Sequence, residues 1–226
     1  MKLSLIIPVY NEEAYIGACL ESVMRQTEKP DEVIVVDNNS TDRTVEIVTH
    51  YPVRILPEKK QGMIPARNAG FNAAQYDIIA RCDADGVLPE DWVARIKQNF
   101  TELDIDALCG PLVYQELPIH NTVVPNLYLD TMKVLQFGNE TMVGPNMALT
   151  KRIWEKVRDK VCLDDKRVHE DIDLGMKIIQ AGGKIHRDRK LIVFSSARRM
   201  KKHPLSFFVE YPWRILKTFV NHIRGC

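Results

Sequence analysis

Two aspartates, one residue apart, come directly after an apolar run of strand length. Asp83 and Asp85 follow residues 78–82, and side chains two positions apart in an extended segment point to the same side. Two such carboxylates suit Mg²⁺ or Mn²⁺, which proteins hold with one or two carboxylates and the oxygens of a substrate phosphate. The same spacing recurs at 104/106 and 171/173, but only the first pair ends a predicted strand. We therefore expect a metal site at this pair, with a solvated turn as the alternative.

Polar residues also follow two other predicted strands, at residues 3–9 and 32–36. In open α/β sheets ligands bind at the carboxyl ends of the strands, so these junctions are candidate binding positions. Asp37 could accept hydrogen bonds from a base or a ribose, and Glu12 either contacts a ligand or interacts with a helix dipole. The first junction lacks GxGxxG and the chain lacks GxxxxGK[ST], so neither a Rossmann dinucleotide site nor a P-loop is supported.

Two further charged segments are candidate parts of the site. One carries Arg67, and the other carries Glu170 and Asp171. Arg67 lies on a predicted helix after a glycine-containing turn, where its planar guanidinium either contacts a phosphate or is simply exposed. Glu170 and Asp171 open another predicted helix, a position that acidic residues favour because of the helix dipole. A carboxylate there could instead be a general base, provided that it lies within hydrogen-bond reach of the hydroxyl that it deprotonates.

The elements that must position these residues alternate between strands and helices. Apolar runs predict strands at residues 3–9, 32–36, 53–56, 77–81, 107–114 and 141–149. Helical spacing of apolar residues predicts helices at residues 12–26, 41–50, 64–74, 154–160 and 172–181. This alternation is typical of an α/β fold with a mostly parallel sheet flanked by helices, and 226 residues are enough for one domain with a sizeable core.

Composition narrows the class of protein. With 45% hydrophobic and 27% charged residues the chain is typical of soluble globular proteins. Charged residues interrupt the longest late apolar stretch, so no membrane helix is predicted, and the apolar start is too short for a signal peptide. Five scattered cysteines without a CxxC pair favour a cytoplasmic protein. Residues 184–226 hold 11 Lys and Arg against 2 acids, which predicts an anionic partner or an exposed basic face.

Six segments, taken in order, resemble inverting glycosyltransferases of family 2 with the GT-A fold. They read PVYNEE, VVDNNSTD, KKQGMIPARNAG, DAD, VGPNMAL and HED. The signal lies in their common order, because each segment alone is weak. The resemblance covers about residues 1–182. It implies a GT-A type fold with a nucleotide-sugar-binding half at 1–105, an acceptor-binding and catalytic half at 106–200 and a basic aromatic tail at 201–226.

The resemblance also implies roles for individual residues. Asp83 and Asp85 would bind Mg²⁺ or Mn²⁺ on the donor diphosphate, and Asp171, next to Glu170, would be the base. The donor pocket would be lined by Pro8, Tyr10, Glu12, Asp37, Asn38, Arg67, Gly144 and Asn146. The family typically has two consecutive acids after the second strand. Asn38 replaces the second of them, which leaves the preferred nucleobase open because an amide both donates and accepts.

Three residues beyond the matched region are further candidates for the predicted site. Arg198 and Arg199 would neutralise the departing diphosphate, with a surface role as the alternative. His203 is a candidate metal or phosphate ligand, although a lone histidine is more often structural. The chain lacks the Gln-x-x-Arg-Trp motif of processive family members, so the resemblance implies one sugar transferred per encounter.

The expected activity is transfer of one sugar from a nucleoside diphosphate sugar to a saccharide or lipid-linked acceptor, with inversion. A nucleotidyltransferase on a similar sheet and an inactive sugar-nucleotide-binding protein are the alternatives. Aromatic and cationic residues alternate within 201–226, which suits peripheral contact with an anionic membrane, near an acceptor of the cell envelope. The same residues could instead pack on the domain. No segment resembles a base-reading motif, so we expect no nucleic-acid partner.

Overall fold

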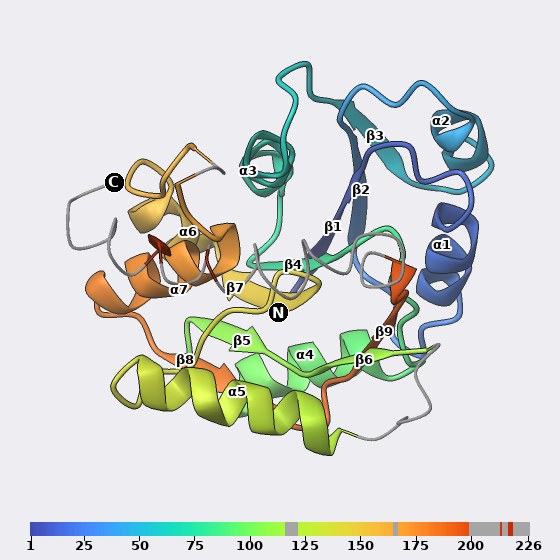
Figure 1. Ribbon diagram of the computed structural model, residues 1–226. Helices are drawn as coiled ribbons and strands as arrows, with labels where there is room; N and C mark the ends of the chain where they lie inside the picture. The colour runs from blue at the N-terminus through green and yellow to red at the C-terminus, as the bar shows by residue number, and fades with distance from the viewer. Residues whose placement is uncertain (116–121, 165–166, 199–212, 214–216, 219–226) are drawn as a thin grey trace.

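A seven-stranded mixed sheet lies at the centre of the molecule (Figure 1). The computed structural model describes residues 1–115, 122–164, 167–198, 213 and 217–218. The large sheet has the strand order β3-β2-β1-β4-β7-β5-β8, and β6 and β9 form a separate pair. The strands are β1 (Leu3–Val9), β2 (Glu32–Asp37), β3 (Arg54–Pro57), β4 (Ile78–Cys82), β5 (Ala107–Cys109), β6 (Leu112–Tyr114), β7 (Asn146–Thr150), β8 (Ile185–Arg187) and β9 (Val193–Ser195). The helices are α1 (Ile16–Met24), α2 (Thr44–Val48), α3 (Met63–Ala73), α4 (Trp92–Glu102), α5 (Val123–Leu135), α6 (Lys151–Val157) and α7 (Glu170–Gln180).

Strands β1, β2 and β4 consist mainly of apolar residues, as expected for strands that are covered on both faces. Every residue of β1 and β4 is buried. Because β1 pairs in parallel with β2 and with β4, the three carboxyl ends lie at the same edge of the sheet, and Val9 is the register partner of Asp37. The polar junctions that follow these strands therefore meet.

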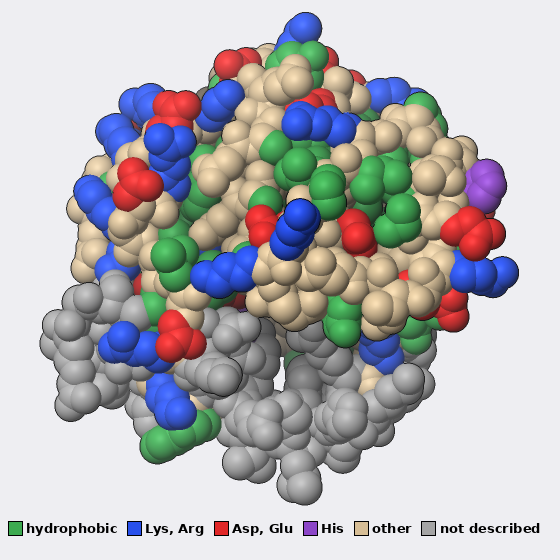
Figure 2. All heavy atoms as spheres, turned by 90° about the horizontal axis from the view of Figure 1, so that it is seen from above, with side chains coloured by type: hydrophobic (Ala, Val, Ile, Leu, Met, Phe, Trp, Pro, Cys, Tyr) green, Lys and Arg blue, Asp and Glu red, His purple; other side chains and the backbone are tan. Residues whose placement is uncertain are grey.

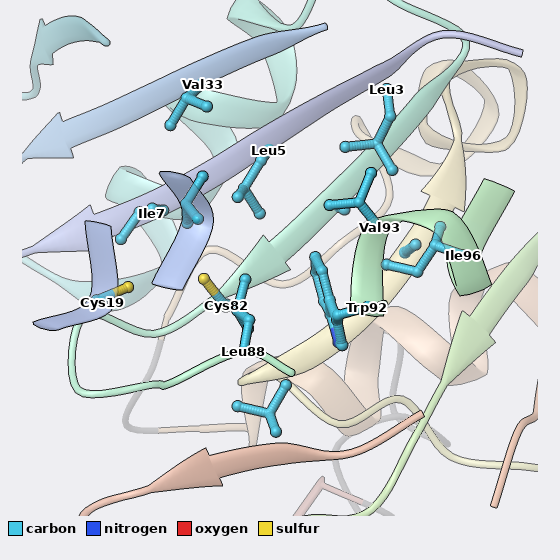
Figure 3. Packing of buried hydrophobic residues seen from close by; sticks show 14 of the residues in the cluster. Leu3, Leu5, Ile7, Cys19, Val33, Cys82, Leu88, Trp92, Val93 and Ile96 are labelled. Atoms are coloured by element: carbon cyan, nitrogen blue, oxygen red, sulfur yellow. The ribbon is translucent and has the colours of Figure 1, made fainter. Parts of the chain in front are cut away.

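Different helices cover the two faces of the sheet. On one face α1, α2 and α4 pack on alternate residues of β1 and β2, in the cluster that Figure 3 shows in part. On the other face α3, α6 and α7 pack on the intervening strand residues, among them Ile6, Ile34 and Val36. Successive strand residues point to opposite faces, so the same apolar strands supply both cores. The α/β fold with a mostly parallel sheet is thus confirmed.

Helix α3 approaches the sheet most closely at Gly70. A Cβ atom at this position would lie 2.3 Å from Ile6 Cγ2 and 2.9 Å from Val36 Cγ2, closer than side chains pack. The helix begins after Gly62, whose φ of 137° favours glycine. The two glycines therefore let α3 start at the edge of the sheet and lie flat on β1 and β2.

Strand β7 joins the second half of the chain to the first. It runs antiparallel to both β4 and β5 and lies between them. The single strand expected at 107–114 is wrong, because β5 and β6 belong to different sheets. Gly110 and Pro111 separate them: a Cβ atom on Gly110 would lie 1.9 Å from the Leu191 carbonyl oxygen, and Pro111 has no N–H for a ladder. The strand expected at 141–149 begins only at Asn146.

Four elements were not expected from the sequence, namely α4, α5, β8 and β9. Helices α1 and α2 are also shorter than the ranges 12–26 and 41–50, because the residues before them form the polar loops of the sheet edge. Within the described residues, no helix combines the length and the apolarity needed to span a membrane. Acidic, basic and apolar side chains are interspersed over the described part of the face in Figure 2.

Candidate active site

The loops that follow β1 and β2 bind each other through side-chain hydrogen bonds. The Asn11 amide nitrogen donates to Ser40 Oγ at 3.1 Å, and the Thr41 amide donates to Asn11 Oδ1 at 2.8 Å. Asn11 and Asn39 have φ angles of 54° and 66°, a region that asparagine adopts more readily than most residues. The Ser40 amide also donates to Asp37 Oδ1 at 3.1 Å. These bonds fix Asp37 at the end of β2, where it is partly exposed.

Asn38 is buried and its side chain is occupied within the protein. Its Nδ2 donates to the carbonyl oxygens of Glu58 and Lys60, both at 2.8 Å. Its Oδ1 accepts from the Gly62 amide at 2.8 Å. The side chain therefore holds the loop between β3 and α3 against β2, and Asp37 is the better placed of the two to meet a nucleotide.

Asp83 and Asp85 follow β4, and an arginine lies beside each of them. Arg81 Nη2 is 3.0 Å from Asp83 Oδ1, and Arg198 Nε is 3.5 Å from Asp85 Oδ2. Ser195 Oγ donates to Asp85 Oδ1 at 3.3 Å. The Asp83 and Asp85 side chains are 25% and 13% exposed, so both reach the surface of the site.

Arg198 connects the segment after β9 to the loop after β1. Its guanidinium pairs with Glu12 as well as with Asp85, and it lies over the Tyr15 ring at 4.5 Å from the centroid. Glu12 Oε2 is buried and has no hydrogen-bond partner among the described residues. A buried acceptor without a donor is costly, so this oxygen is suited to receive a hydroxyl or N–H group of a ligand.

Glu170 lies between two buried arginines. Arg81 Nη1 is 2.5 Å from Glu170 Oε1, and Arg67 Nη1 is 2.6 Å from Oε2. Burial alone would raise the pKa of Glu170, but the charges of Arg81 and Arg67 outweigh it and the pKa is lowered. Both oxygens are thus committed to cations, and Glu170 is poorly suited to act as the base. Arg67 is likewise buried against Glu170 and Asn68 instead of facing the solvent.

Asp171 differs from its neighbour because its partners leave an acceptor position open. Oδ1 contacts His169 Nδ1 and accepts from the Ile172 amide, whereas Oδ2 accepts the Gly144 amide, at 2.8 Å, and no other hydrogen bond from the part of the chain that the structure describes. Burial raises the pKa of Asp171, but the His169 charge and hydrogen bond and the Gly144 amide lower it to about 2. Asp171 is therefore ionised at neutral pH. A carboxylate oxygen has two lone pairs, so Oδ2 can still accept a hydroxyl proton.

Gly144 lies close to the Glu170 and Asp171 carboxylates and to Arg81 of β4. A Cβ atom on Gly144 would lie 3.2 Å from Asp171 Oδ2, 3.4 Å from Arg81 Nη2 and 3.4 Å from Glu170 Oε1. Arg81 in turn contacts Asp83. The candidate base and the candidate metal ligands thus belong to one contiguous site.

The other predicted site residues differ in burial and in their contacts. Asn146 is buried, accepts from Trp92 Nε1 at 2.9 Å and donates to the carbonyl oxygens of Pro111 and Leu191, so its side chain supports the site from behind. Pro8 is buried within β1, whereas Tyr10 is half exposed. Arg199 and His203, which were predicted to bind phosphate or metal, lie outside the described residues.

Sequence reasoning missed two residues of the site. Arg81 is the only charged residue of β4, and a lone arginine in an otherwise apolar strand was a usable signal. Tyr128 on α5 gave no such signal. Tyr128 is 46% exposed; partial burial, together with the negative charges of Asp171 and Tyr114, raises its pKa to about 12. The charge of the candidate base therefore acts on Tyr128.

The oxygen donors present fit a divalent cation bound together with a diphosphate. Asp83 and Asp85 supply hard carboxylate ligands, and Asp83 Oδ2 takes no hydrogen bond among the described residues. No group of three or more His, Cys, Asp or Glu side chains in the described part of the chain could hold a metal by itself. This donor set matches the usual mode of Mg²⁺ binding, in which substrate phosphates complete the coordination.

A mostly parallel sheet with flanking helices, an antiparallel β7 and carboxylates gathered at the carboxyl edge define a glycosyltransferase fold of the GT-A type. Residues 4–158 match the family model of Glycosyl transferase family 2. The chain belongs to this family, as the six sequence segments indicated.

Two curated relatives illustrate the similarity. Glycosyltransferase GlyG of Streptococcus pneumoniae is 32% identical over 114 residues, which are 48% of this chain and 38% of GlyG. The uncharacterized glycosyltransferase alr2836 of Nostoc sp. is 33% identical over 171 residues, which are 70% of this chain and 53% of that protein. The chain therefore matches only about half, or less, of these relatives' own lengths.

Solved structures share the fold at lower identity. The mannosyltransferase PcManGT from Pyrobaculum calidifontis, in complex with GDP-Man and Mn²⁺, has a TM-score of 0.80 and 20% identity, covering 100% of this chain and 65% of that one. TarS of S. aureus, in complex with UDP-GlcNAc, has a TM-score of 0.69 and 19% identity, covering 87% and 58%. At these identities the comparison establishes the fold alone.

Proposed function

We propose that the protein transfers a single sugar from a nucleoside diphosphate sugar to an acceptor hydroxyl, with inversion at the anomeric carbon and with Mg²⁺ or Mn²⁺ as cofactor. The observation that carries this proposal is the contiguity of two partly buried carboxylates, Asp83 and Asp85, with an ionised carboxylate, Asp171, whose Oδ2 accepts a single hydrogen bond among the described residues. Family membership supports sugar transfer. PcManGT, whose structure holds GDP-Man and Mn²⁺, supports the donor class and the metal.

In the proposed reaction the two sides of the site have separate tasks. Asp171 Oδ2 takes the proton of the acceptor hydroxyl as that oxygen attacks the anomeric carbon, and the Gly144 amide keeps this carboxylate in place. Arg198 supplies positive charge next to Asp85, where the leaving diphosphate would lie. A divalent cation held by Asp83 and Asp85 would add charge stabilisation to the leaving group. One displacement of this kind inverts the anomeric centre.

The donor side is proposed to use Glu12 and Asp37. Glu12 offers a buried oxygen that has no donor among the described residues, and Asp37 is held at the strand end by the Ser40 amide. Both accept hydrogen bonds, so they suit ribose hydroxyls or base N–H groups. Asn38 is occupied by backbone partners and does not discriminate between bases in this proposal. The sheet shared by both halves supports their acting as one catalytic unit.

A product assay separates this proposal from its rivals. With Mn²⁺, an acceptor panel and a panel of UDP- and GDP-sugars, we expect release of the nucleoside diphosphate together with a glycosylated acceptor. Release of pyrophosphate from a nucleoside triphosphate would support the nucleotidyltransferase instead. Tight donor binding without hydrolysis or transfer across the panel would support an inactive binding protein.

We further propose that the acceptor is lipid-linked and that the enzyme works in the cytoplasm at the membrane face. The tail at 201–226, on which this expectation first rested, lies almost entirely outside the described residues. Helix α5 gives independent support. It exposes Val123, Val124, Leu127, Val134 and Leu135, and Phe137 just beyond it is 97% exposed.

Vesicle binding tests this part of the proposal. We expect the chain to co-sediment with vesicles containing anionic lipid and Leu127→Glu/Phe137→Ser to co-sediment less, because apolar contact with the bilayer is lost. Leu163→Ser removes another exposed leucine, at a distance in sequence from α5, and serves as the control. Equal sedimentation of all three proteins would show that α5 does not contribute to membrane binding.

A further inference from the structure

Three charged side chains from three different elements form a buried cluster beneath the candidate site. Arg67 of α3 and Arg81 of β4 are 0% and 1% exposed, and Glu170 of α7 is 9% exposed. Glu170 receives one arginine on each carboxylate oxygen, at 2.5 and 2.6 Å. The Glu170 carbonyl also accepts from Arg67 Nη1 at 2.9 Å. The cluster therefore fixes the start of α7, and with it Asp171, against the sheet and α3.

Arg81 extends this cluster to the surface of the site. While Nη1 contacts Glu170, Nη2 lies 3.0 Å from Asp83 Oδ1 and 3.3 Å from Met63 Sδ. Its planar fork thus bridges a buried acid and a partly buried one, a geometry that a lysine ammonium cannot reproduce. Arg67 makes its side-chain hydrogen bonds to Glu170 and Asn68, and so belongs to the buried part.

The direct ion pairs of this arrangement join two guanidinium groups to two carboxylates, those of Glu170 and Asp83. The charges of Asp171 and Asp173 also act on Arg67. Arg81 occupies Oδ1 of Asp83, and Oδ2 takes no hydrogen bond among the described residues. Replacing buried ion pairs by apolar residues is often neutral or stabilising, so stability alone gives a weak reason for three buried charges here.

We propose that Arg81 is a positioning residue that orients the Asp83 carboxylate for the divalent cation, and that Glu170 supports Arg81 in this role and is not a base. This inference rests on the proposed function, because it takes Asp83 as a metal ligand. Arg81 holds one carboxylate oxygen and leaves the other to the cation. It also links the cation site mechanically to α7, which carries Asp171.

The test compares two lysine substitutions that disturb the same buried acid. Arg81→Lys keeps a positive charge but loses the fork that reaches Asp83, whereas Arg67→Lys loses a fork that reaches only Glu170 and Asn68. Mn²⁺ binding is measured by calorimetry on the full chain in the presence of UDP or GDP, and thermal unfolding is followed in parallel. We expect Arg81→Lys to weaken Mn²⁺ binding about 10- to 100-fold, as loss of outer-shell partners of metal ligands usually does. Arg67→Lys should lower Tm by about as much as Arg81→Lys does, but it should leave the Mn²⁺ affinity unchanged.

The possible results separate this inference from the proposed function. Equal Mn²⁺ affinities for the two variants and the wild type, or equal losses in both variants, would overturn the positioning role while leaving the metal-dependent transferase intact. A wild type that binds no Mn²⁺ with either nucleotide would contradict the metal dependence, and the inference would fall with it. If Arg81→Lys does not fold, Glu170→Gln decides. With Glu170 neutral, Arg81 pairs more strongly with Asp83 and Mn²⁺ binding should weaken, so an unchanged affinity would reject the inference.

Discussion

Glu170 and Asp171 are neighbours in sequence but have opposite surroundings. Glu170 faces two guanidinium groups, whereas Asp171 faces His169 and the amides of Gly144 and Ile172. Arg67 and Arg81 hold the Glu170 carboxylate in a structural role. The His169 charge and hydrogen bond, together with the Gly144 amide, stabilise the second as a carboxylate, and its Oδ2 accepts a single hydrogen bond among the described residues. The division of roles follows from these partners and could not be read from the adjacent letters in the sequence.

The lowered pKa of Asp171 predicts an acid-dependent contribution to stability. The folded-state pKa of about 2 lies below the ordinary value of 3.8, so ionised Asp171 stabilises the fold at neutral pH by about 2 kcal/mol. This contribution is fully present above about pH 4 and is lost as the pH falls through 2. Thermal unfolding of the wild type and of Asp171→Asn between pH 7 and pH 3 should show a Tm difference that narrows below pH 4. A difference that widens as the pH falls would contradict the assignment.

Several site residues could be predicted from the sequence because they follow apolar strands. Asp83, Asp85 and Glu12 were expected at strand ends, and parallel pairing of β1 with β2 and β4 brings those ends together. Arg198 was placed near the leaving group, and it lies beside Asp85. The exposure of Arg67 could not be predicted, because it depends on contact with Glu170, 103 residues further along the chain.

The packing of helix α3 on the sheet can be tested by substitution, because its closest contact, at Gly70, has no room for a side chain. Gly70→Ala would place a Cβ atom 2.3 Å from Ile6 Cγ2, and overpacking of this kind costs about 1–3 kcal/mol, more than the roughly 1 kcal/mol that alanine gains in a helix. We expect a lower Tm. Gly17→Ala in α1 is the matched control, since its nearest neighbour would lie 3.8 Å away and its Tm should be unchanged or higher. Equal Tm values for the two variants would show that α3 does not pack as described.

The elements that sequence periodicity missed are those with unusual surroundings. Helix α4 has Trp92, Val93, Ile96 and Phe100 at helical spacing and could have been predicted. In α5, apolar residues lie on the exposed side as well as on the buried one, and Pro125 falls within its first turn, so no single apolar face appears. Strands β8 and β9 have three residues each, too few for a periodic signal.

At the scale of the whole molecule, one sheet joins the edge that carries the candidate donor-binding residues to α7, which carries Glu170 and Asp171. Strand β7 lies between β4 and β5, and α7 packs on the face opposite to α1. The arrangement brings the candidate metal ligands and the candidate base to one site, while two separate cores support it. The α/β class was predictable from the alternation of strand and helix patterns, and family membership from the order of the motifs. The insertion of an antiparallel strand was not predictable, because it depends on long-range pairing.

Turnover of Asp171→Asn tests most directly whether this site transfers a sugar with Asp171 as its base. With the donor and acceptor identified by the product assay and with saturating Mn²⁺, the account predicts a kcat about 10²- to 10⁴-fold below that of the wild type, with nucleoside diphosphate binding retained. Because Asn keeps the size of the side chain, the retained binding separates a lost base from a lost fold. A kcat equal to that of the wild type, measured with the true substrates, would contradict the account.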